Sequence, residues 1–143
     1  MKVRDIMTKA VITLGTDDTV EKAASAMKEH NIGVVPVCES GRVVGVVTDR
    51  DITLRTVAVG QDPRNQYVRD IMSSNPVTGS PDMTIDEISR LMSERQIKRI
   101  PIVENNNTLI GVIALGDLAV RPNLNREAEY ALSSISEPST PEY

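Results

Sequence analysis

Apolar residues recur at helical spacing in two stretches of the chain. In the first stretch the positions i, i+3, i+4 and i+7 are Val20, Ala23, Ala24 and Met27. In the second stretch the apolar positions are Ile85, Ile88, Leu91 and Met92. Such stripes predict amphipathic helices, the first over residues 19–30. Asp18 with Glu21 is a candidate cap for the first helix, and Thr84 with Glu87 fits a capping box for the second.

Two short apolar runs follow each predicted helix. They cover residues 32–37 and 43–47 in the first half of the chain, and 100–103 and 109–113 in the second. Because the runs are apolar throughout rather than alternating, they predict strands buried on both faces. The segments between them contain Gly, Ser and Asn, which tolerate positive φ, so each pair of runs predicts a hairpin.

A second helix is expected after each hairpin, the first over about 49–59 and ending at Gly60. Residues 125–135 predict one more helix, since Ala128, Leu132 and Ile135 lie close to one face. The last residues, 136–143, hold two prolines and two acids and predict a frayed end.

The chain also contains an internal repeat. The sequence Val-Arg-Asp-Ile-Met occupies residues 3–7 and returns at 68–72, an offset of 65 residues. Further positions match at the same offset: Asp17, Thr19, Met27, Glu29, Ile32, Pro36 and Glu39 correspond to Asp82, Thr84, Met92, Glu94, Ile97, Pro101 and Glu104. The repeat predicts an α/β fold of two β-α-β-β-α copies, residues 1–60 and 68–122, joined by a connector at 61–67 and followed by a helix and tail at 123–143.

Composition excludes several classes of function. The net charge is −4 and Phe and Trp are absent, so neither a phosphate backbone nor stacked bases would be bound well. No stretch of 18 apolar residues occurs, and charges interrupt the N-terminal region, so we expect a cytoplasmic protein with no membrane partner. Cys38 is the single cysteine, which rules out an intrachain disulfide.

Four segments together identify a family resemblance. They are Ile-Gly-Val-Val-Pro-Val at 32–37, Gly-Val-Val-Thr-Asp-Arg-Asp at 45–51, Ile-Lys-Arg-Ile-Pro-Ile at 97–102 and Gly-Val-Ile-Ala-Leu-Gly-Asp at 111–117. In order, spacing and duplication they resemble a pair of cystathionine-β-synthase (CBS) domains, also called a Bateman module, over about residues 1–120. The chain is similar in particular to small, stand-alone bacterial CBS-pair proteins.

The resemblance implies a sensor rather than an enzyme. Family members bind adenosyl compounds such as AMP, ADP, ATP or S-adenosylmethionine in clefts between the repeats and shift the packing of a homodimer or of a protein partner. It implies no cofactor beyond that ligand. The sequence agrees, because it shows neither a nucleophile with a base nor a metal cluster.

Thr48 and Asp51 match the family segment in which a carboxylate accepts hydrogen bonds from both ribose hydroxyls and a hydroxyl contacts the sugar or first phosphate. The alternative is a capping box, which also needs a hydroxyl and an acid three residues later. The second copy has Ala114 in place of the hydroxyl but keeps Asp117. An acid kept without its capping partner favours the ligand interpretation, and the lost hydroxyl predicts a weaker second site.

The resemblance assigns further residues to the two sites. The base-contacting positions of the first site are Ile12, Thr13, Val34, Val35 and Pro36, with Gly33 allowing close approach of the backbone. Lys98 and Arg99 are expected near the phosphates of that same site, Arg99 with its bidentate fork. The second site comprises Val77, Thr78, Ile100, Pro101 and Asp117. Each apolar side chain alone would equally suit a core position.

His30 and Cys38 are the remaining candidates for chemistry. One of each does not complete a usual zinc site, so no metal site is expected. His30 more simply favours the negative end of a helix, and Cys38 packs as a small apolar group. The function expected is therefore a nucleotide sensor, and the alternative is an interaction module with the same fold and no ligand.

Overall fold

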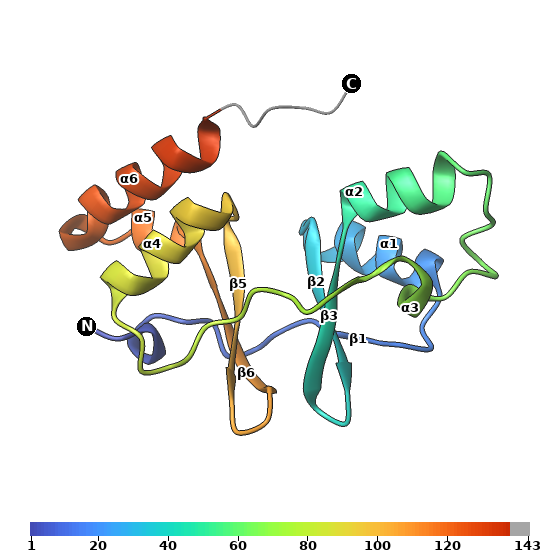
Figure 1. The fold of residues 1–143 in the computed structure, drawn as a ribbon, viewed down its shortest axis with the longest axis horizontal. Coiled ribbons are helices and arrows are strands. Elements are labelled where there is room, and N and C mark those ends of the chain that lie inside the picture. Colours follow the sequence, from blue (N-terminus) through green and yellow to red (C-terminus); the bar gives the residue numbers. More distant parts are fainter. Residues whose placement is uncertain (138–143) are drawn as a thin grey trace. The chain divides into compact units, whose positions relative to one another are not determined.

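The computed structural model describes residues 1–137. The chain forms two compact units (Figure 1). Unit 1 contains Met1–Lys9, Thr78–Ile102 and the described residues from Ile110 onward, and unit 2 contains Ala10–Val77 with Val103–Leu109. Each unit therefore combines segments from both halves of the sequence.

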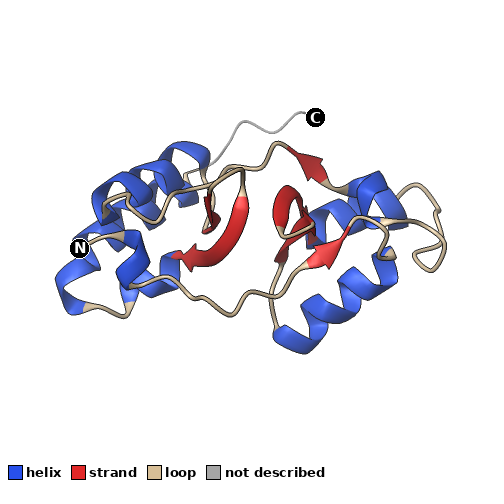
Figure 2. Cartoon of the chain, turned by 90° about the horizontal axis from the view of Figure 1, so that it is seen from below, coloured by secondary structure: helices blue, strands red, loops and turns tan. Residues whose placement is uncertain are grey.

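Unit 2 is a small sheet with helices on one side (Figures 1 and 2). Its elements are β1 (Leu14–Gly15), α1 (Val20–His30), β2 (Val34–Glu39), β3 (Arg42–Thr48), α2 (Asp49–Ile52), the π-helical η2 (Thr53–Val57), α3 (Val68–Ile71) and β4 (Ser73–Ser74). β1 runs parallel to β2, and β2 and β4 are both antiparallel to β3. Aliphatic side chains of α1, α3 and the strands form its core.

Unit 1 repeats this plan and adds a helix. Its elements are the 3₁₀ turn η1 (Val3–Asp5), α4 (Ile85–Arg95), the larger parts of β5 (Arg99–Glu104) and β6 (Thr108–Ala114), α5 (Leu115–Ala119), the 3₁₀ turn η3 (Pro122–Leu124) and α6 (Asn125–Ser136). The turn between β5 and β6, with the adjoining strand ends at Val103–Leu109, belongs to unit 2. The first strand is reduced to a single parallel bridge between Gly79 and Ile102. α6 packs on both α4 and α5, and Gln96 Nε2 donates to its Ser134 carbonyl at 3.1 Å.

The repeated Val-Arg-Asp-Ile-Met segments explain why the units combine both halves. In unit 2 the segment at 68–72 lies against the first copy, where Val68 N–H donates to Asp18 O at 2.8 Å and Arg69 pairs with Asp17. In unit 1 the segment at 3–7 lies against the second copy, where Val3 N–H donates to Met83 O at 2.9 Å.

The same ion pair recurs there between Arg4 and Asp82. Each copy therefore supplies the segment that completes the other copy's helical unit. Arg4 and Arg69 are equivalent positions of the two copies, and so are Asp17 and Asp82. Their ion pairs have a structural role, because they attach each exchanged segment to the other copy.

The predicted helices and hairpins are confirmed, including positive φ at Ser40, Gly41 and at 105–107 in the turns. The helix predicted over 49–59 is helical from Asp49 to Val57, and Gly60 adopts φ +74°. The helix over 125–135 is α6. The predicted α/β class is confirmed. Of the end predicted to fray, residues 138–143 lie outside the described part.

Two local predictions are wrong. Thr19, not Asp18, caps α1, because its hydroxyl accepts the Lys22 N–H at 3.2 Å. The second strand of each hairpin alternates between buried and half-buried positions and is not buried on both faces.

Asp18 has a different role from the predicted one. Its carboxylate accepts the Gly15 N–H at 2.7 Å and pairs with Lys22 Nζ at 3.0 Å. Burial by itself would raise the pKa of Asp18, but these two partners outweigh it and hold the pKa below its usual value. Asp18 therefore ties the loop before α1 to the helix in its ionised form.

Candidate functional site

The candidate site in unit 2 is built where β3 runs directly into α2. Thr48 ends the strand opposite Val34 of β2, and the Asp49 N–H donates to Gly33 O at 2.9 Å. The hairpin thus brings Gly33 and Val34 next to Thr48. An extended residue followed at once by a helix leaves the first amides of that helix without intrahelical partners.

Thr48 and Asp51 satisfy two of these amides reciprocally. Asp51 Oδ2 accepts the Thr48 N–H at 2.9 Å, and Thr48 Oγ1 accepts the Asp51 N–H at 3.1 Å. This is a complete capping box. Thr48 and Asp51 therefore do cap α2, as the alternative interpretation of the sequence proposed. A capped carboxylate still has acceptor capacity, because its two oxygens offer about four lone-pair sites.

Arg55 lies one helical turn beyond Asp51. Its Nη1 is 3.9 Å from Asp51 Oδ1, an ion pair in which the Asp51 side chain is only 13% exposed and that of Arg55 is 52% exposed. The same Nη1 donates to Ile71 O at 2.9 Å. Sequence reasoning missed Arg55, although its spacing of four residues from Asp51 was a usable signal.

The second copy keeps half of the cap. Asp117 accepts the Ala114 N–H at 2.8 Å, and the Leu115 N–H donates to Lys98 O at 2.8 Å, as Asp49 does to Gly33. Asp117 therefore has a backbone partner without any threonine. The presence of Asp117 in the second copy is therefore no argument for a ligand by itself, because the carboxylate has a structural role in accepting the Ala114 N–H.

The predicted ligand-binding residues are divided between the two units. Unit 2 holds Ile12, Thr13, Gly33, Val34, Val35, Pro36, Thr48, Asp51 and Val77. Unit 1 holds Thr78, Lys98, Arg99, Ile100, Pro101 and Asp117. Their ligand roles stay predictions.

Burial separates candidates for direct contact from core residues. Ile12, Thr13, Lys98 and Arg99 are exposed, whereas Val35, Pro36, Ile100 and Pro101 are buried. Within unit 1 the Gly79 N–H donates to Pro101 O at 2.9 Å, which brings the segment after Thr78 alongside β5.

Gly33 allows close approach of a side chain. A Cβ at this position would lie 3.0 Å from Asp49 Oδ2. The space above Gly33 is thus occupied by the Asp49 carboxylate, which also accepts the Arg50 N–H at 2.9 Å. Asp49 is a further site neighbour that the sequence did not single out.

His30 and Cys38 lie where the sequence placed them. His30 is exposed at the end of α1, and Cys38 is half-buried in β2, where burial raises the pKa of its thiol. Across residues 1–137, no three or more His, Cys, Asp or Glu side chains form a group suited to holding a metal ion.

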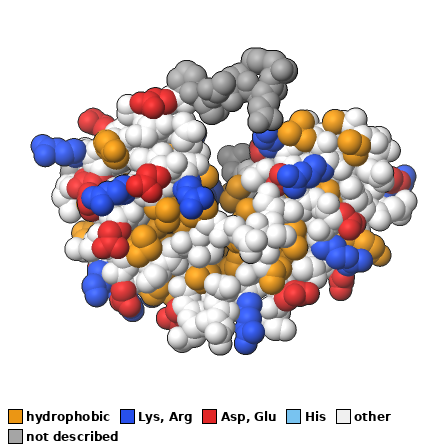
Figure 3. Space-filling view, in the orientation of Figure 1, with side chains coloured by type: hydrophobic (Ala, Val, Ile, Leu, Met, Phe, Trp, Pro, Cys, Tyr) orange, Lys and Arg blue, Asp and Glu red, His pale blue; other side chains and the backbone are white. Residues whose placement is uncertain are grey.

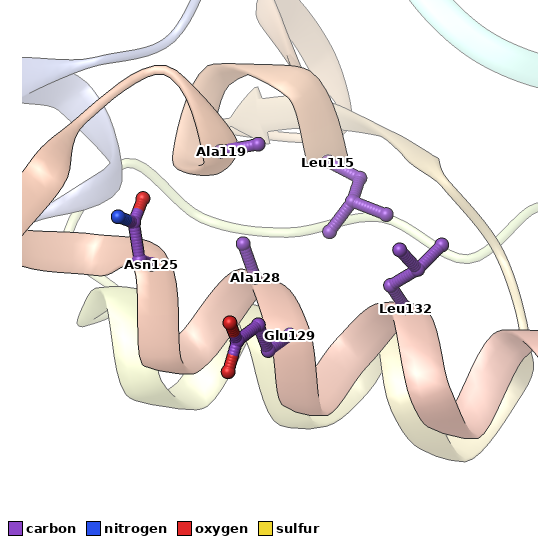
Figure 4. Close-up of a pocket in the computed structure, with 6 residues that line it drawn as sticks. All are labelled: Leu115, Ala119, Asn125, Ala128, Glu129 and Leu132. Carbon is purple, nitrogen blue, oxygen red and sulfur yellow. The ribbon is translucent and has the colours of Figure 1, made fainter.

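Two of the cavities that described residues line lie in unit 1. One, of about 190 Å³, lies between α5 and α6, where Leu115 and Leu132 face one another (Figure 4). The other, of about 310 Å³, is lined by Asp86, Ser89, Arg90, Arg126, Glu127 and Tyr130. Neither is lined by a predicted ligand-binding residue.

The surface carries interspersed charges. On the face shown in Figure 3, Lys and Arg side chains alternate with Asp and Glu and form no extended basic patch. None of the helices in the described part of the chain combines the length and apolarity needed to cross a membrane.

Comparison with known sequences shows the same duplication. The family model for the CBS domain matches the chain twice, at residues 3–56 and 68–121. The CBS domain-containing protein YhcV of Bacillus subtilis is 48% identical over 134 residues, which is 94% of this chain and 94% of that protein. Hypoxic response protein 1 of Mycobacterium tuberculosis is 32% identical over 117 residues, or 81% of each chain.

Two solved structures are similar to most of this chain. The crystal structure of Hypoxic Response Protein I with two coordinated zinc ions has a TM-score of 0.76 at 32% identity and covers 83% of this chain and 97% of its own. The CBS domain pair of protein MJ0100, in complex with 5′-methylthioadenosine and S-adenosyl-L-methionine, has a TM-score of 0.73 at 27% identity, with the same coverage. With both copies matched and both units built on one plan, this chain belongs to the CBS-domain family, as a tandem pair of CBS domains.

Proposed function

We propose that this CBS pair is a non-catalytic regulatory module that binds an adenosyl nucleotide, such as AMP, ADP, ATP or S-adenosylmethionine, and transmits its occupancy to a homodimer or to a protein partner. It would act in the cytoplasm and would bind neither nucleic acid nor a membrane. The observation that carries the proposal is Asp51, a mostly buried carboxylate at a strand end with acceptor capacity beyond its capping bond.

The chemistry of Asp51 suits a ribose. A cis-diol presents two hydroxyl donors, and an ionised carboxylate accepts from both without a change in protonation. Asp51 Oδ2 is engaged by one backbone amide, and Oδ1 has an ion-pair distance, not a hydrogen bond, to Arg55. The exposed Ile12 and Thr13 belong to the same unit and are proposed to contact the base. Ligands in the related MJ0100 structure are adenosyl compounds, which supports this class.

The test is isothermal titration calorimetry of the full chain with AMP, ADP, ATP, S-adenosylmethionine and 5′-methylthioadenosine. GTP serves as a base control and 2′,3′-dideoxyadenosine as a ribose control. Asp51→Asn is the informative variant, since its amide oxygen still accepts the Thr48 N–H while the amino group replaces one acceptor with a donor. Hydrogen bonds to a charged group contribute roughly 1.5–3 kcal/mol, so affinity should fall about ten- to a hundredfold.

Asp117→Asn is the matched control, because Asp117 makes the same bond to its own strand end. It should change the affinity of the principal site little. Binding of dideoxyadenosine as strong as that of AMP, or equal losses for both variants, would contradict the assignment of Asp51. Arg99→Ala and Lys98→Ala test separately whether the basic pair contributes; a smaller loss for 5′-methylthioadenosine than for ATP would show a phosphate contact.

A second function is favoured by exposed apolar residues. Leu54, Val57 and Val59 on and after η2 are 47%, 69% and 61% exposed, an unusual run for one short segment. In a ligand-free interaction module, no nucleotide would raise the melting temperature, and Leu54→Glu with Val57→Glu would change the mass measured by light scattering.

A further inference from the structure

Arg55 joins the candidate ligand carboxylate to a distant part of the chain within unit 2. Its Nη1 hydrogen-bonds the carbonyl of Ile71 at 2.9 Å and lies 3.9 Å from Asp51 Oδ1. Ile71 is the last residue of α3, whose final carbonyls have no intrahelical donor. The guanidinium thus caps α3 and neighbours Asp51 at the same time.

The segment after Ile71 is held closely against the strand that leads to the site. Ser73 and Ser74 pair with Val46 and Gly45 of β3, and β3 ends at Thr48. The segment is therefore connected to the site twice, through β3 and through the Arg55 side chain.

The backbone of Arg55 is itself fixed. Gln66 Nε2 donates to Arg55 O at 3.1 Å, and Gln66 Oε1 accepts from the fully buried Thr56 hydroxyl at 2.6 Å. The π-helical bond from Ala58 N–H to Thr53 O, at 2.9 Å, keeps this turn helical. Single π turns inside helices are frequent at functional sites.

The second copy has the same residue spacing but not the same arrangement. Asp117 and Arg121 are also four residues apart, but α5 ends at Ala119 and Arg121 has φ −104° and ψ 116°. A residue before a proline is steered to such extended angles, and Pro122 follows. The arginine of the second copy is therefore outside the helix, and no ion pair joins it to Asp117 among the described residues.

We propose that Arg55 is a positioning residue that couples ligand occupancy at Asp51 to the order of the segment 68–74. The inference rests on the proposed function. A ribose that binds Asp51 fixes the carboxylate opposite Arg55, so the guanidinium loses alternative orientations and its bond to Ile71 O persists. By reciprocity, a more ordered segment increases the affinity for the ligand. The chain then signals from one copy, because only that copy places its arginine beside the carboxylate.

The test is amide hydrogen exchange read by mass spectrometry on the full chain, with and without millimolar AMP and 5′-methylthioadenosine. Binding is measured in parallel by calorimetry. In the wild type, either compound should slow exchange of residues 68–74 several-fold. Arg55→Gln should speed their exchange without ligand and abolish the ligand effect, while binding weakens only a few-fold. Arg55→Lys, which keeps the charge and one donor, should restore part of the effect.

Arg121→Gln is the matched control and should leave both the exchange of 68–74 and its response to ligand unchanged. If the wild type binds ligand but 68–74 does not respond, or if Arg55→Gln keeps the response, the coupling is refuted while the proposed function stands. If neither compound binds, the proposed function fails and the coupling fails with it. If Arg55→Gln leaves ligand-free exchange unchanged, the link to Ile71 is refuted whatever binds.

Discussion

Substituting Gly45 by alanine tests the contact on which the exchanged segment depends. Gly45 lies in β3 opposite Ser74, and a Cβ there would be 2.8 Å from Met72 Sδ and 2.9 Å from Ser73 O. The methionine side chain can move, but the carbonyl belongs to the paired backbone. Ordinary contact begins at 3.4 Å, so β4 would have to shift by about 0.5 Å.

The expected cost follows from two opposing effects. Overpacking of this kind costs about 1–3 kcal/mol, while alanine restricts the unfolded chain and gives back about 0.5–1 kcal/mol. We expect a net loss of roughly 1–2 kcal/mol, which lowers the melting temperature by about 3–7 °C in a chain of this size. The assay is urea denaturation followed by circular dichroism, with a thermal scan of the same samples.

Two other glycines make the test specific. Gly111→Ala should cost about as much, because its Cβ would meet Met7 Sδ at 2.8 Å and Thr8 O at 2.9 Å. Gly116→Ala, inside α5 with no atom within 4 Å of the added Cβ, should stabilise by about 0.5–1 kcal/mol. A neutral or stabilising Gly45→Ala beside a stabilising Gly116→Ala would refute the close approach of β4 to β3.

Four further substitutions test the local structure. Because the pKa of Asp18 is lowered in the folded state, the stabilisation by its carboxylate is complete above the usual value of 3.8 and is lost as the pH falls through the folded pKa. Asp18→Asn should flatten this loss of stability in acid, and Lys22→Ala should flatten it in part. The measurement is urea denaturation at several pH values. Thr56→Val should cost roughly 1–2 kcal/mol in the same assay, because Gln66 Oε1 loses its 2.6 Å donor; a neutral result would mean that water replaces it. Ala114→Thr should stabilise by about 1 kcal/mol by completing the second cap, and no gain in melting temperature would show that the hydroxyl does not reach the helix amide.

The sequence predicts the helices and strands of this fold well because each of them shows one pattern of hydrophobic positions. The apolar stripe of α4 locates the helix and its inner face. It does not show that Ser89 and Ser93 are also buried, which happens because α6 covers a second face of the helix. Their hydroxyls donate to carbonyls of their own helix, so burial costs little. A polar residue satisfied within its helix gives no sequence signal of burial.

The exchange of segments is beyond what periodicity can predict. A match between residues 3–7 and 68–72 shows that the two copies are alike, but each segment would fit either copy equally well. Which copy it joins depends on the length and path of the chain between them. The crosswise pairs of Arg69 with Asp17 and of Arg4 with Asp82 are visible only in three dimensions.

Comparison of the two copies distinguishes the structural role of Asp51 from a role in ligand binding. Asp51 and Asp117 accept equivalent backbone bonds of 2.9 and 2.8 Å, so capping explains the presence of both acids and distinguishes neither. A cap does not need a guanidinium, and a cation that attracts the carboxylate does not strengthen its bond to a neutral amide. The pairing with Arg55 is therefore the feature of the first copy that capping leaves unexplained. Asparagine at either position keeps the cap and removes the charge, so equal tolerance at both would reduce Asp51 to a structural residue, and a loss confined to position 51 would show that its charge serves the ligand.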